Sequence, residues 1–277
     1  MCCFASMDAV TKWLASDYSV AQILWLRYAF FTGFALLMMR STGIRAGARS
    51  ARPWLQAGRA LLLVVENGVF VLAVRYLPLA QVHAIASVSP LVVIALSAPL
   101  LGERVGVRRW LAVSAGFGGV LLVIRPGFQT IEWPVLIPLV GAIMWACYQI
   151  LVRLCSRFDR SETTLFWSAA IGVAAMSAVG PFQWRSPDAG DWALLLLLSV
   201  LGSLGHYTLI KALQFAEAGA VQPFSYTLLV WAATLGYLVF GNVPDRWTIA
   251  GAAVIVASGL YSLRLGRQPV QGALPPA

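Results

Sequence analysis

The sequence predicts an all-α protein, a polytopic membrane helix bundle with ten transmembrane helices, of which the first is truncated. Three observations predict this fold. The 277-residue chain is 60% hydrophobic and only 11% charged, whereas soluble domains carry about 25% charged residues. Its apolar residues form runs of about 20, the length of helix that crosses a hydrocarbon core. Its basic residues fall mostly between these runs.

Ten apolar segments follow one another along the chain. The first, at residues 1–14, is short and already contains Asp8 and Lys12, so we expect that its true start lies upstream. The other nine are residues 20–39, 55–77, 79–101, 107–124, 133–154, 163–182, 192–213, 218–240 and 247–265. Residues 268–277 form a polar tail with Pro and Gly, which we expect to be disordered.

Residues 79–124 form the hairpin that fixes the membrane topology. The run at 79–101 has no charged residue, and as one helix it would rise about 34 Å, enough for a core of about 30 Å. The short polar knot Gly102-Glu103-Arg104 separates it from the next run, which begins near Arg108 and Arg109. The knot is therefore predicted to lie in water on one side of the membrane.

Lysine and arginine residues divide unequally between the two sides of the predicted membrane. One side collects 14 of them, and the other collects only four, which are Arg75, Arg125, Arg185 and Arg246. Because cytoplasmic loops are rich in Lys and Arg, the richer side is predicted to be cytoplasmic. This side carries the knot and both chain termini. We therefore expect a multi-pass protein of the bacterial inner (plasma) membrane.

The two halves of the chain resemble each other. Leu100-Leu101-Gly102-Glu103 corresponds to Val239-Phe240-Gly241-Asn242, at an offset of 139 residues, which is one half of the chain. With five segments per half, the second half enters the membrane from the opposite side. The sequence thus predicts two inverted repeats, residues 1-126 and 127-267, followed by the tail at 268-277, and such repeats are typical of secondary transporters.

The sequence around the knot resembles a known family. The Leu-Leu-Gly-Glu-Arg motif after a proline-containing apolar run, the glycine-rich helix that ends in GVLLVIRPG, and the MDAVTKWL opening are similar to the drug/metabolite transporter superfamily. The ten-helix EamA-type branch is the nearest resemblance. It implies a carrier of small metabolites, often amino acids or related compounds. The second knot, Gly241-Asn242, lacks the usual Glu-Arg pair.

Several other function classes are disfavoured. The net charge of +9 lies in predicted loops and forms no basic groove interleaved with aromatic residues, so we expect no nucleic-acid partner. No nucleophile elbow, phosphate loop or metal-binding spacing is present, and the four cysteines form no metal or disulfide pattern. We expect no catalytic residue, cofactor or metal, and not an enzyme.

Four of the charged residues inside apolar segments are singled out as intramembrane charges: Asp8, Lys12, Arg27 and Glu66. Charges at membrane depth are costly, so each is expected to face a partner or a cavity. Asp8 and Lys12 share a helix face and could pair with each other, and we hypothesise that Arg27 pairs with Glu66. The alternative is that Arg27 or Glu66 contacts a zwitterionic substrate or a coupling proton.

Polar and aromatic residues at helical spacing are the candidates for a substrate cavity. His83 and Ser87 share one face, and the same spacing recurs later in the chain. Such stripes either line an amphipathic cavity or pack helices together, and the two histidines either relay protons or pack. The candidates are Glu66, Asn67, Phe70, His83, Ser87, Trp145, Tyr148, Gln149, His206, Gln222 and Tyr226.

The function predicted from these features is secondary transport by alternating access. The partners are a small-molecule substrate, with an amino acid or a derivative as the first choice, and the lipid bilayer. Coupling to protons is left open, as is the choice between monomer and homodimer. The alternative is a structural or receptor-like polytopic membrane protein without transport activity.

Overall fold

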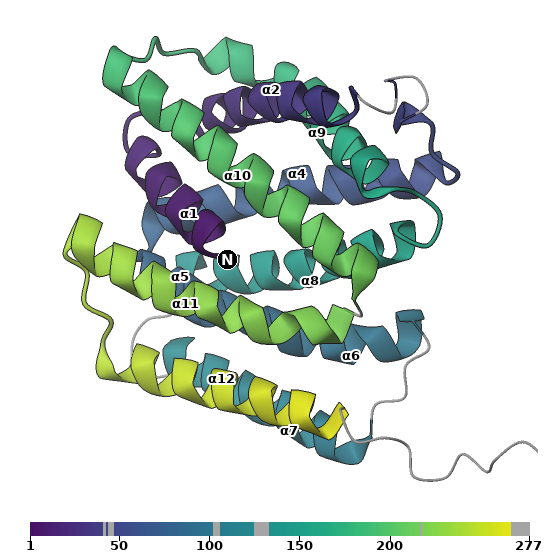
Figure 1. Cartoon of the computed structure of the whole chain (residues 1–277). Coiled ribbons are helices and arrows are strands. Elements are labelled where there is room, and N and C mark those ends of the chain that lie inside the picture. Colours follow the sequence, from purple (N-terminus) through teal and green to yellow (C-terminus); the bar gives the residue numbers. More distant parts are fainter. Residues whose placement is uncertain (41–42, 44–46, 102–105, 125–132, 217, 267–277) are drawn as a thin grey trace, which may run out of the picture.

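The chain is described here by a computed structural model in which residues 41–42, 44–46, 102–105, 125–132, 217 and 267–277 are not described. The predicted knot at 102–104 and the predicted tail at 268–277 therefore lie outside the described residues. Every regular element in the described part of the chain is helical, and the helices run roughly side by side (Figure 1). The predicted all-α class is confirmed.

The helices follow the predicted segments closely. They are α1 (Cys2–Leu14), α2 (Val20–Met38), α4 (Pro53–Tyr76), α5 (Leu79–Ala86), α6 (Ser89–Leu101), α7 (Val107–Ile124), α8 (Ile137–Cys155), α9 (Ser161–Ser177), α10 (Ala189–Phe215), α11 (Ala218–Phe240) and α12 (Arg246–Gly266). Two 3₁₀ turns, η1 (Trp133–Leu136) and η2 (Gly180–Gln183), precede α8 and α10. Within the described residues, six helical segments are long and apolar enough to cross a membrane.

The predicted single helix at 79–101 is wrong in one respect, because it is interrupted between α5 and α6. Pro90 has no N–H, so it cannot donate to the carbonyl of Ala86, four residues earlier. At the interruption Val88 N–H donates to Ile85 O over 3.2 Å, and the Ser87 hydroxyl donates to Ala84 O over 2.6 Å. The interruption places Ser87 and Ser89 at the middle of the bundle.

Helix contacts occur in matched sets between the first five segments and the last five. Helix α1 packs on α10, and α8 packs on α4. Helix α2 packs on α10, and α9 packs on α4; likewise α1 packs on α11, and α8 packs on α6. The pairs α2–α9 and α7–α12 each join one helix from either half, and they lie at opposite edges of the bundle (Figure 1).

Glycines bring α7 and α12 into backbone contact. A Cβ atom on Gly119 would lie 2.8 Å from the carbonyl oxygen of Gly251, and a Cβ atom on Gly251 would lie 2.5 Å from the carbonyl oxygen of Gly119. Real Cβ atoms do not approach so closely, so only glycine fits at either position. These residues serve packing within the chain, as small residues do in membrane bundles.

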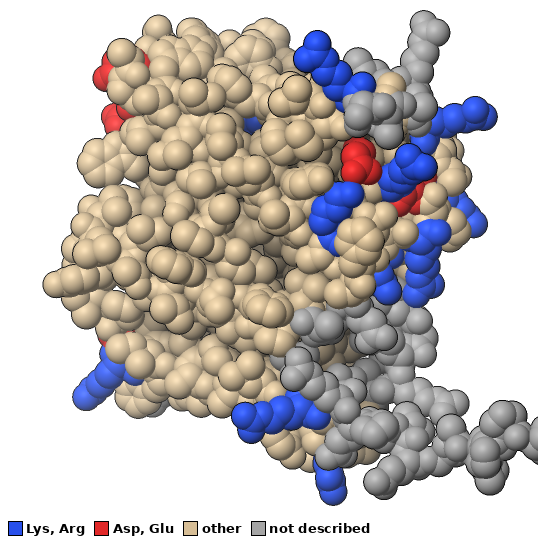
Figure 2. Space-filling model, in the orientation of Figure 1, with Lys and Arg blue, Asp and Glu red and all other residues tan. Residues whose placement is uncertain are grey.

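Charged side chains gather at the two ends of the helices (Figure 2). One end carries the exposed arginines Arg40, Arg49, Arg52, Arg157 and Arg160. Arg59 is one of the 14 basic residues that the sequence assigns to this side, but it lies inside α4 and is 0% exposed. In this view the surface between the ends carries almost no Lys, Arg, Asp or Glu, as expected for a wall that faces lipid.

At the other end, the turn before α2 and the first turn of α2 are bonded to the first turn of α10 and to the segment that precedes it. The Tyr18 hydroxyl donates to Asp191, and this hydrogen bond raises the pKa of Tyr18 to about 12. Gln22 and Arg185 exchange two bonds: the Gln22 amide donates to the Arg185 carbonyl over 2.6 Å, and the Arg185 N–H donates back over 2.8 Å. These bonds join the first two helices to the start of α10 at this end.

Candidate functional site

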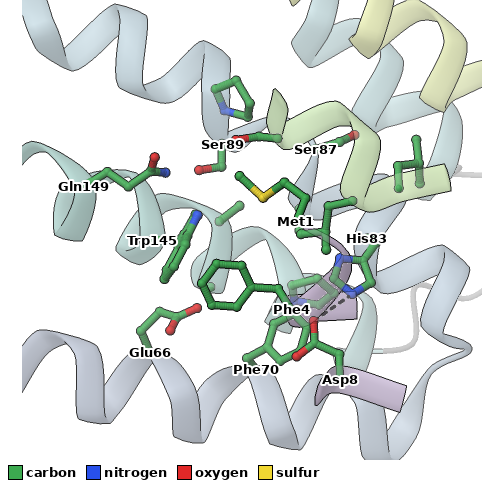
Figure 3. Close-up of a pocket in the computed structure, with 18 of the residues that line it drawn as sticks. Met1, Phe4, Asp8, Glu66, Phe70, His83, Ser87, Ser89, Trp145 and Gln149 are labelled. Carbon is green, nitrogen blue, oxygen red and sulfur yellow. Dashed lines mark ion pairs between the residues drawn. The ribbon is translucent and has the colours of Figure 1, made fainter. Parts of the chain in front are cut away.

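A cavity of about 90 Å³ lies near the middle of the bundle, where helices from both halves of the chain meet (Figure 3). Helices α1, α4, α5 and α6 line one part of it, and α8, α10 and α11 line the rest. Ser87 at the interruption between α5 and α6 is also at the wall. A site at the interface of the two halves, next to an interrupted helix, is where transporters hold their substrates.

Aromatic rings form much of the wall. Phe4 stands edge-on to Trp145, with ring centroids 5.8 Å apart and planes at 82°, and also edge-on to His206 at 5.2 Å. Trp145 is stacked on its other neighbour, Tyr148, at 5.3 Å. Phe70 lies 5.4 Å from the ring of His83. The wall thus offers flat apolar surfaces, which suit a flat apolar or aromatic ligand group.

Asp8 and His83 form a buried pair at the cavity wall. Asp8 Oδ2 lies 3.2 Å from His83 Nε2, and both side chains are almost fully buried (Figure 3). The predicted pairing of Asp8 with Lys12 is therefore wrong. Lys12 instead donates to the backbone carbonyls of Val74 and Leu77, each over 2.6 Å, at the end of α4. The carbonyls at a helix end attract a cation, which explains this choice.

Glu66 points its carboxylate into the cavity, toward Phe4 and Trp145 (Figure 3). Its side chain is buried, with 6% of the residue exposed. Among the described residues, this carboxylate makes no hydrogen bond and no ion pair. Carboxylates are rarely buried without a partner, so this group is the strongest sign of a ligand site in the cavity.

Arg27 approaches Glu66 without pairing with it. Its guanidinium donates to the side-chain oxygen of Asn67 and lies 3.7 Å from the sulfur of Met7. The Asn67 amide in turn donates to the Tyr28 hydroxyl over 3.1 Å and to Leu63 O over 2.8 Å. The hypothesised Arg27–Glu66 ion pair is wrong, because Asn67, the neighbour of Glu66 on α4, takes the guanidinium.

Four buried polar atoms of the cavity residues lack a hydrogen-bond partner in the described part of the chain: Ser89 Oγ, Gln149 Nε2, His206 Nδ1 and His83 Nε2, the last of which lies in the ion pair with Asp8. Gln149 uses its oxygen to accept from Gln222 Nε2 over 3.2 Å, which leaves its nitrogen free. Buried polar atoms are nearly always bonded in proteins. Their convergence on one cavity therefore indicates that a ligand completes their bonding.

The structure separates the sequence-predicted site residues into two groups. Nine line the cavity: Asp8, Glu66, Asn67, Phe70, His83, Ser87, Trp145, Gln149 and His206. Five lie outside its wall. Tyr148 and Gln222 lie behind it, against Trp145 and Gln149, while Tyr226 lies against Gly259 of α12. Lys12 and Arg27 have the partners described above.

Sequence reasoning missed Phe4 and Ser89. Phe4 lies four residues before Asp8, which is the spacing that singled out the other stripes, so the signal was present. Ser89 is adjacent to Pro90, and only the interruption of the helix brings it to the wall. Among the described residues, no group of three His, Cys, Asp or Glu side chains could hold a metal ion.

A second buried polar region, which we call the Arg59 cluster, consists of Gln56, Arg59, Asp159, Thr164 and Ser168. Arg59 donates to Gln56 Oε1 over 2.9 and 3.1 Å, to Ser168 Oγ over 2.9 Å and to Thr164 O over 2.9 Å. Gln56 donates to Asp159 over 2.8 Å. Asp159 also accepts from Ser50 and from the N–H of Ala51. This cluster joins α4 to α9 at the arginine-rich end of the bundle.

The chain matches the EamA-like transporter family twice, at residues 1–125 and 132–264. It is 29% identical to a riboflavin transporter of Rhizobium johnstonii over 268 residues, which cover 94% of this chain and 87% of that protein. It is 25% identical to an S-adenosylmethionine uptake transporter of Rickettsia prowazekii, over 92% of this chain and 86% of that protein.

Two further proteins extend the comparison. A pseudopaline exporter of Pseudomonas aeruginosa is 29% identical over 92% of this chain and 90% of that protein. One crystal structure shares the fold, with a TM-score of 0.67 at 18% identity and coverage of 96% of both chains. The chain therefore belongs to the EamA-like transporter family of the drug/metabolite transporter superfamily, and it is a multi-pass membrane transporter, not an enzyme.

Proposed function

We propose that this chain is a secondary carrier that moves a small organic metabolite across the bacterial inner membrane by alternating access. The observation that carries the proposal is the central cavity, with aromatic walls and an unpartnered Glu66 carboxylate. A structural membrane protein gains nothing from a buried charge without a partner. A carrier needs such a group, because its ligand supplies the missing partner.

The proposed mechanism uses two inverted repeats, residues 1–126 and 127–267, each with five membrane segments. The matched helix contacts support this division, since exchanging the halves converts each contact set into its counterpart. An odd number of segments per half gives the halves opposite orientations. The arginine-rich end is proposed to be cytoplasmic, with both termini on that side. The cavity is formed within one chain, so a monomer suffices.

Alternating access requires that the two ends of the bundle open in turn. The Arg59 cluster holds α4 to α9 at the arginine-rich end, and the bonds from Tyr18 and Gln22 close the other end. Because both ends are bonded, we propose that the described conformation lies close to the occluded state. Opening either end breaks one set of bonds, and the substrate or proton gradient is proposed to drive the cycle.

The substrate is proposed to be an amino acid derivative that carries an aromatic ring system. The S-adenosylmethionine uptake transporter of Rickettsia prowazekii supports a derivative of this kind. Riboflavin is the second candidate, favoured by the aromatic wall around Trp145 and by the relative from Rhizobium johnstonii. Both compounds contain a flat nitrogen-containing ring, which such a wall accommodates.

Counterflow in proteoliposomes tests the proposal. The purified chain is reconstituted into vesicles loaded with an unlabelled compound, and uptake of the same labelled compound is measured, with S-adenosylmethionine, riboflavin and aromatic amino acids compared. We expect saturable uptake of one of them above protein-free vesicles, and its loss in Trp145→Ala. The exposed variant Leu61→Ala on α4 is the matched control and should transport normally. Uptake no faster than in protein-free vesicles for every compound contradicts the proposal.

A further inference from the structure

The cavity contains polar groups of opposite hydrogen-bonding character, and their arrangement specifies a ligand. Glu66 offers a carboxylate, which only accepts hydrogen bonds when ionised, whereas Gln149 offers an N–H₂ group, which only donates. In Figure 3 the side chain of Trp145 lies between these two groups. Trp145 and Gln149 are four residues apart on α8 and therefore share a face.

No described residue donates a hydrogen bond to the carboxylate of Glu66 or forms an ion pair with it. Arg27, the guanidinium on α2, is taken by Asn67. Asp8 on α1 holds His83 on α5. On α8 the ring of Tyr148 lies 5.6 Å from the guanidinium of Arg59, and its hydroxyl makes no hydrogen bond among the described residues. On α10, His206 makes ring contacts with Phe4 and Trp145. A ligand N–H can therefore supply the donor that the Glu66 carboxylate lacks.

The cavity also contains an aromatic surface on which a flat ligand ring could stack. One side of Trp145 is covered by the stacked ring of Tyr148, and Phe4 stands edge-on to Trp145 at 5.8 Å. The cavity of about 90 Å³ has no room for a further bicyclic ring while Phe4 keeps this position. A ligand ring that stacks on Trp145 thus takes the place of Phe4, which lies on the short helix α1.

We infer that Glu66 and Gln149 select the substrate by the edges of a flat nitrogen heteroaromatic ring. The ring lies against Trp145, Glu66 accepts a hydrogen bond from an N–H on one edge, and Gln149 donates to an oxygen or nitrogen acceptor on another edge. The inference rests on the proposed transport function and names the part of the substrate that the cavity recognises. A site that bonds to a substrate N–H discriminates against an analogue that lacks it, since its own buried group then stays unpaired.

Matched ligand pairs test this inference directly. Riboflavin is compared with its N3-methyl derivative, and S-adenosylmethionine with its analogue dimethylated on the adenine amine. Each methylated compound keeps the ring but loses the N–H. Binding to the purified full chain in detergent is measured by calorimetry. We expect the wild type to bind the N–H form of the true substrate about tenfold more tightly than the methylated form.

Variants of Glu66 separate recognition from folding. Glu66→Gln is isosteric and should reduce the discrimination to less than about twofold, while Glu66→Asp keeps a carboxylate and should restore most of it. Glu162→Gln is the matched control, because the carboxylate of Glu162 is bonded to Lys211 at 2.8 Å outside the cavity. It should keep the tenfold ratio. Gln149→Leu should weaken both members of a pair by the same factor.

The outcomes distinguish the inference from the function on which it rests. If the wild type binds neither pair, the proposed substrates are contradicted. If it binds one pair but does not distinguish the methylated form, or if Glu66→Gln keeps the full discrimination, the inference alone is overturned. If the riboflavin pair shows the tenfold preference for the N–H form, the recognised ring is a flavin. If the S-adenosylmethionine pair shows it, the ring is an adenine.

Discussion

Arg59 and Glu66 lie seven residues apart on the same face of α4, about 10.5 Å from each other along the helix axis, yet their surroundings are opposite. Both side chains are buried. Every donor nitrogen of Arg59 has a partner in the Arg59 cluster. The carboxylate of Glu66 has no hydrogen bond or ion pair among the described residues. One helix therefore carries a satisfied charge and an unsatisfied one, two turns apart.

The difference separates two uses of a buried charge in a membrane protein. A satisfied charge stabilises the conformation in which its bonds are made, so Arg59 favours the closed arginine-rich end. An unsatisfied charge destabilises the empty protein and lowers the free energy of the complex that satisfies it. This cost of an unpaired buried group is what a ligand recovers on binding. Removing the charge of Arg59 should therefore lower the stability of the protein. Removing the charge of Glu66 should raise the stability of the empty protein and weaken ligand binding.

The largest expected effect is the loss of stability on removing Arg59. Arg59→Leu leaves Gln56 Oε1 and Ser168 Oγ without the donor they have in a buried region, while Thr164 O keeps only the Ser168 hydroxyl among its side-chain donors. We expect the free energy of unfolding to fall by about 3 kcal/mol. Denaturant unfolding in detergent measures it, with the exposed Arg157→Leu as the control, which should change by less than about 0.5 kcal/mol. If Arg59→Leu and Arg157→Leu were equally stable, the bonds of Arg59 would not stabilise the protein, and the comparison with Glu66 would fail.

The next effect has the opposite sign. Glu66→Gln replaces an unpaired buried carboxylate with a neutral amide of the same shape, so we expect the unliganded protein to gain about 1 kcal/mol in stability. Counterflow should nevertheless fall at least tenfold. A lower unfolding free energy for Glu66→Gln would mean that Glu66 has a partner in the empty protein, which contradicts the comparison.

Two serines provide a smaller and better matched test. Ser168 Oγ accepts from Arg59 over 2.9 Å, whereas Ser89 Oγ at the cavity has no partner in the described part of the chain. Ser168→Ala should destabilise the protein by about 1 kcal/mol, because it leaves one donor of Arg59 unpaired. Ser89→Ala should be neutral or slightly stabilising. Thermal unfolding of both variants in the same detergent checks the prediction, and the same loss for both would count against it.

The smallest expected effect is a change of stability with pH, at the end of the bundle that lies away from the arginine-rich end. The pKa of Tyr18 is raised from 10.0 to about 12 by its hydrogen bond to Asp191, so the folded state favours the protonated phenol. The stability that this bond contributes is fully present below pH 10 and is lost as the pH rises through 12. The stability difference between wild type and Tyr18→Phe should therefore shrink between pH 10 and pH 12. A difference that stays constant over this range would exclude the bond.

Much of the fold and part of the site could be predicted from the sequence. The helix boundaries follow the apolar runs, because membrane thickness sets the length of each segment. The residues on one face of α4 and α8, such as Glu66 and Trp145, were found because polar groups at helical spacing stand out in apolar surroundings. Helical spacing alone assigned them to a common face.

The remaining features depend on contacts between distant parts of the chain. Arg59 lies near the start of its apolar segment and looks like an interfacial residue, and its partners Thr164 and Ser168 are more than 100 residues away. Gln222 and Tyr226 have the same spacing as His83 and Ser87. The side chain of Tyr226 nevertheless packs against Gly259 of α12 and not into the cavity. Neither contact leaves a local signal in the sequence.

The backbone contact between Gly119 and Gly251 has a consequence for how the halves move. It joins the last helix of each half at one edge of the bundle, while α2 and α9 meet at the opposite edge (Figure 1). Because touching backbones resist sliding, the rocking motion of the proposed cycle would have its fulcrum at α7 and α12. Displacement then grows with the lever arm, and probes on α2 and α9 should travel farthest during the cycle, whereas probes on the glycine pair should keep their separation.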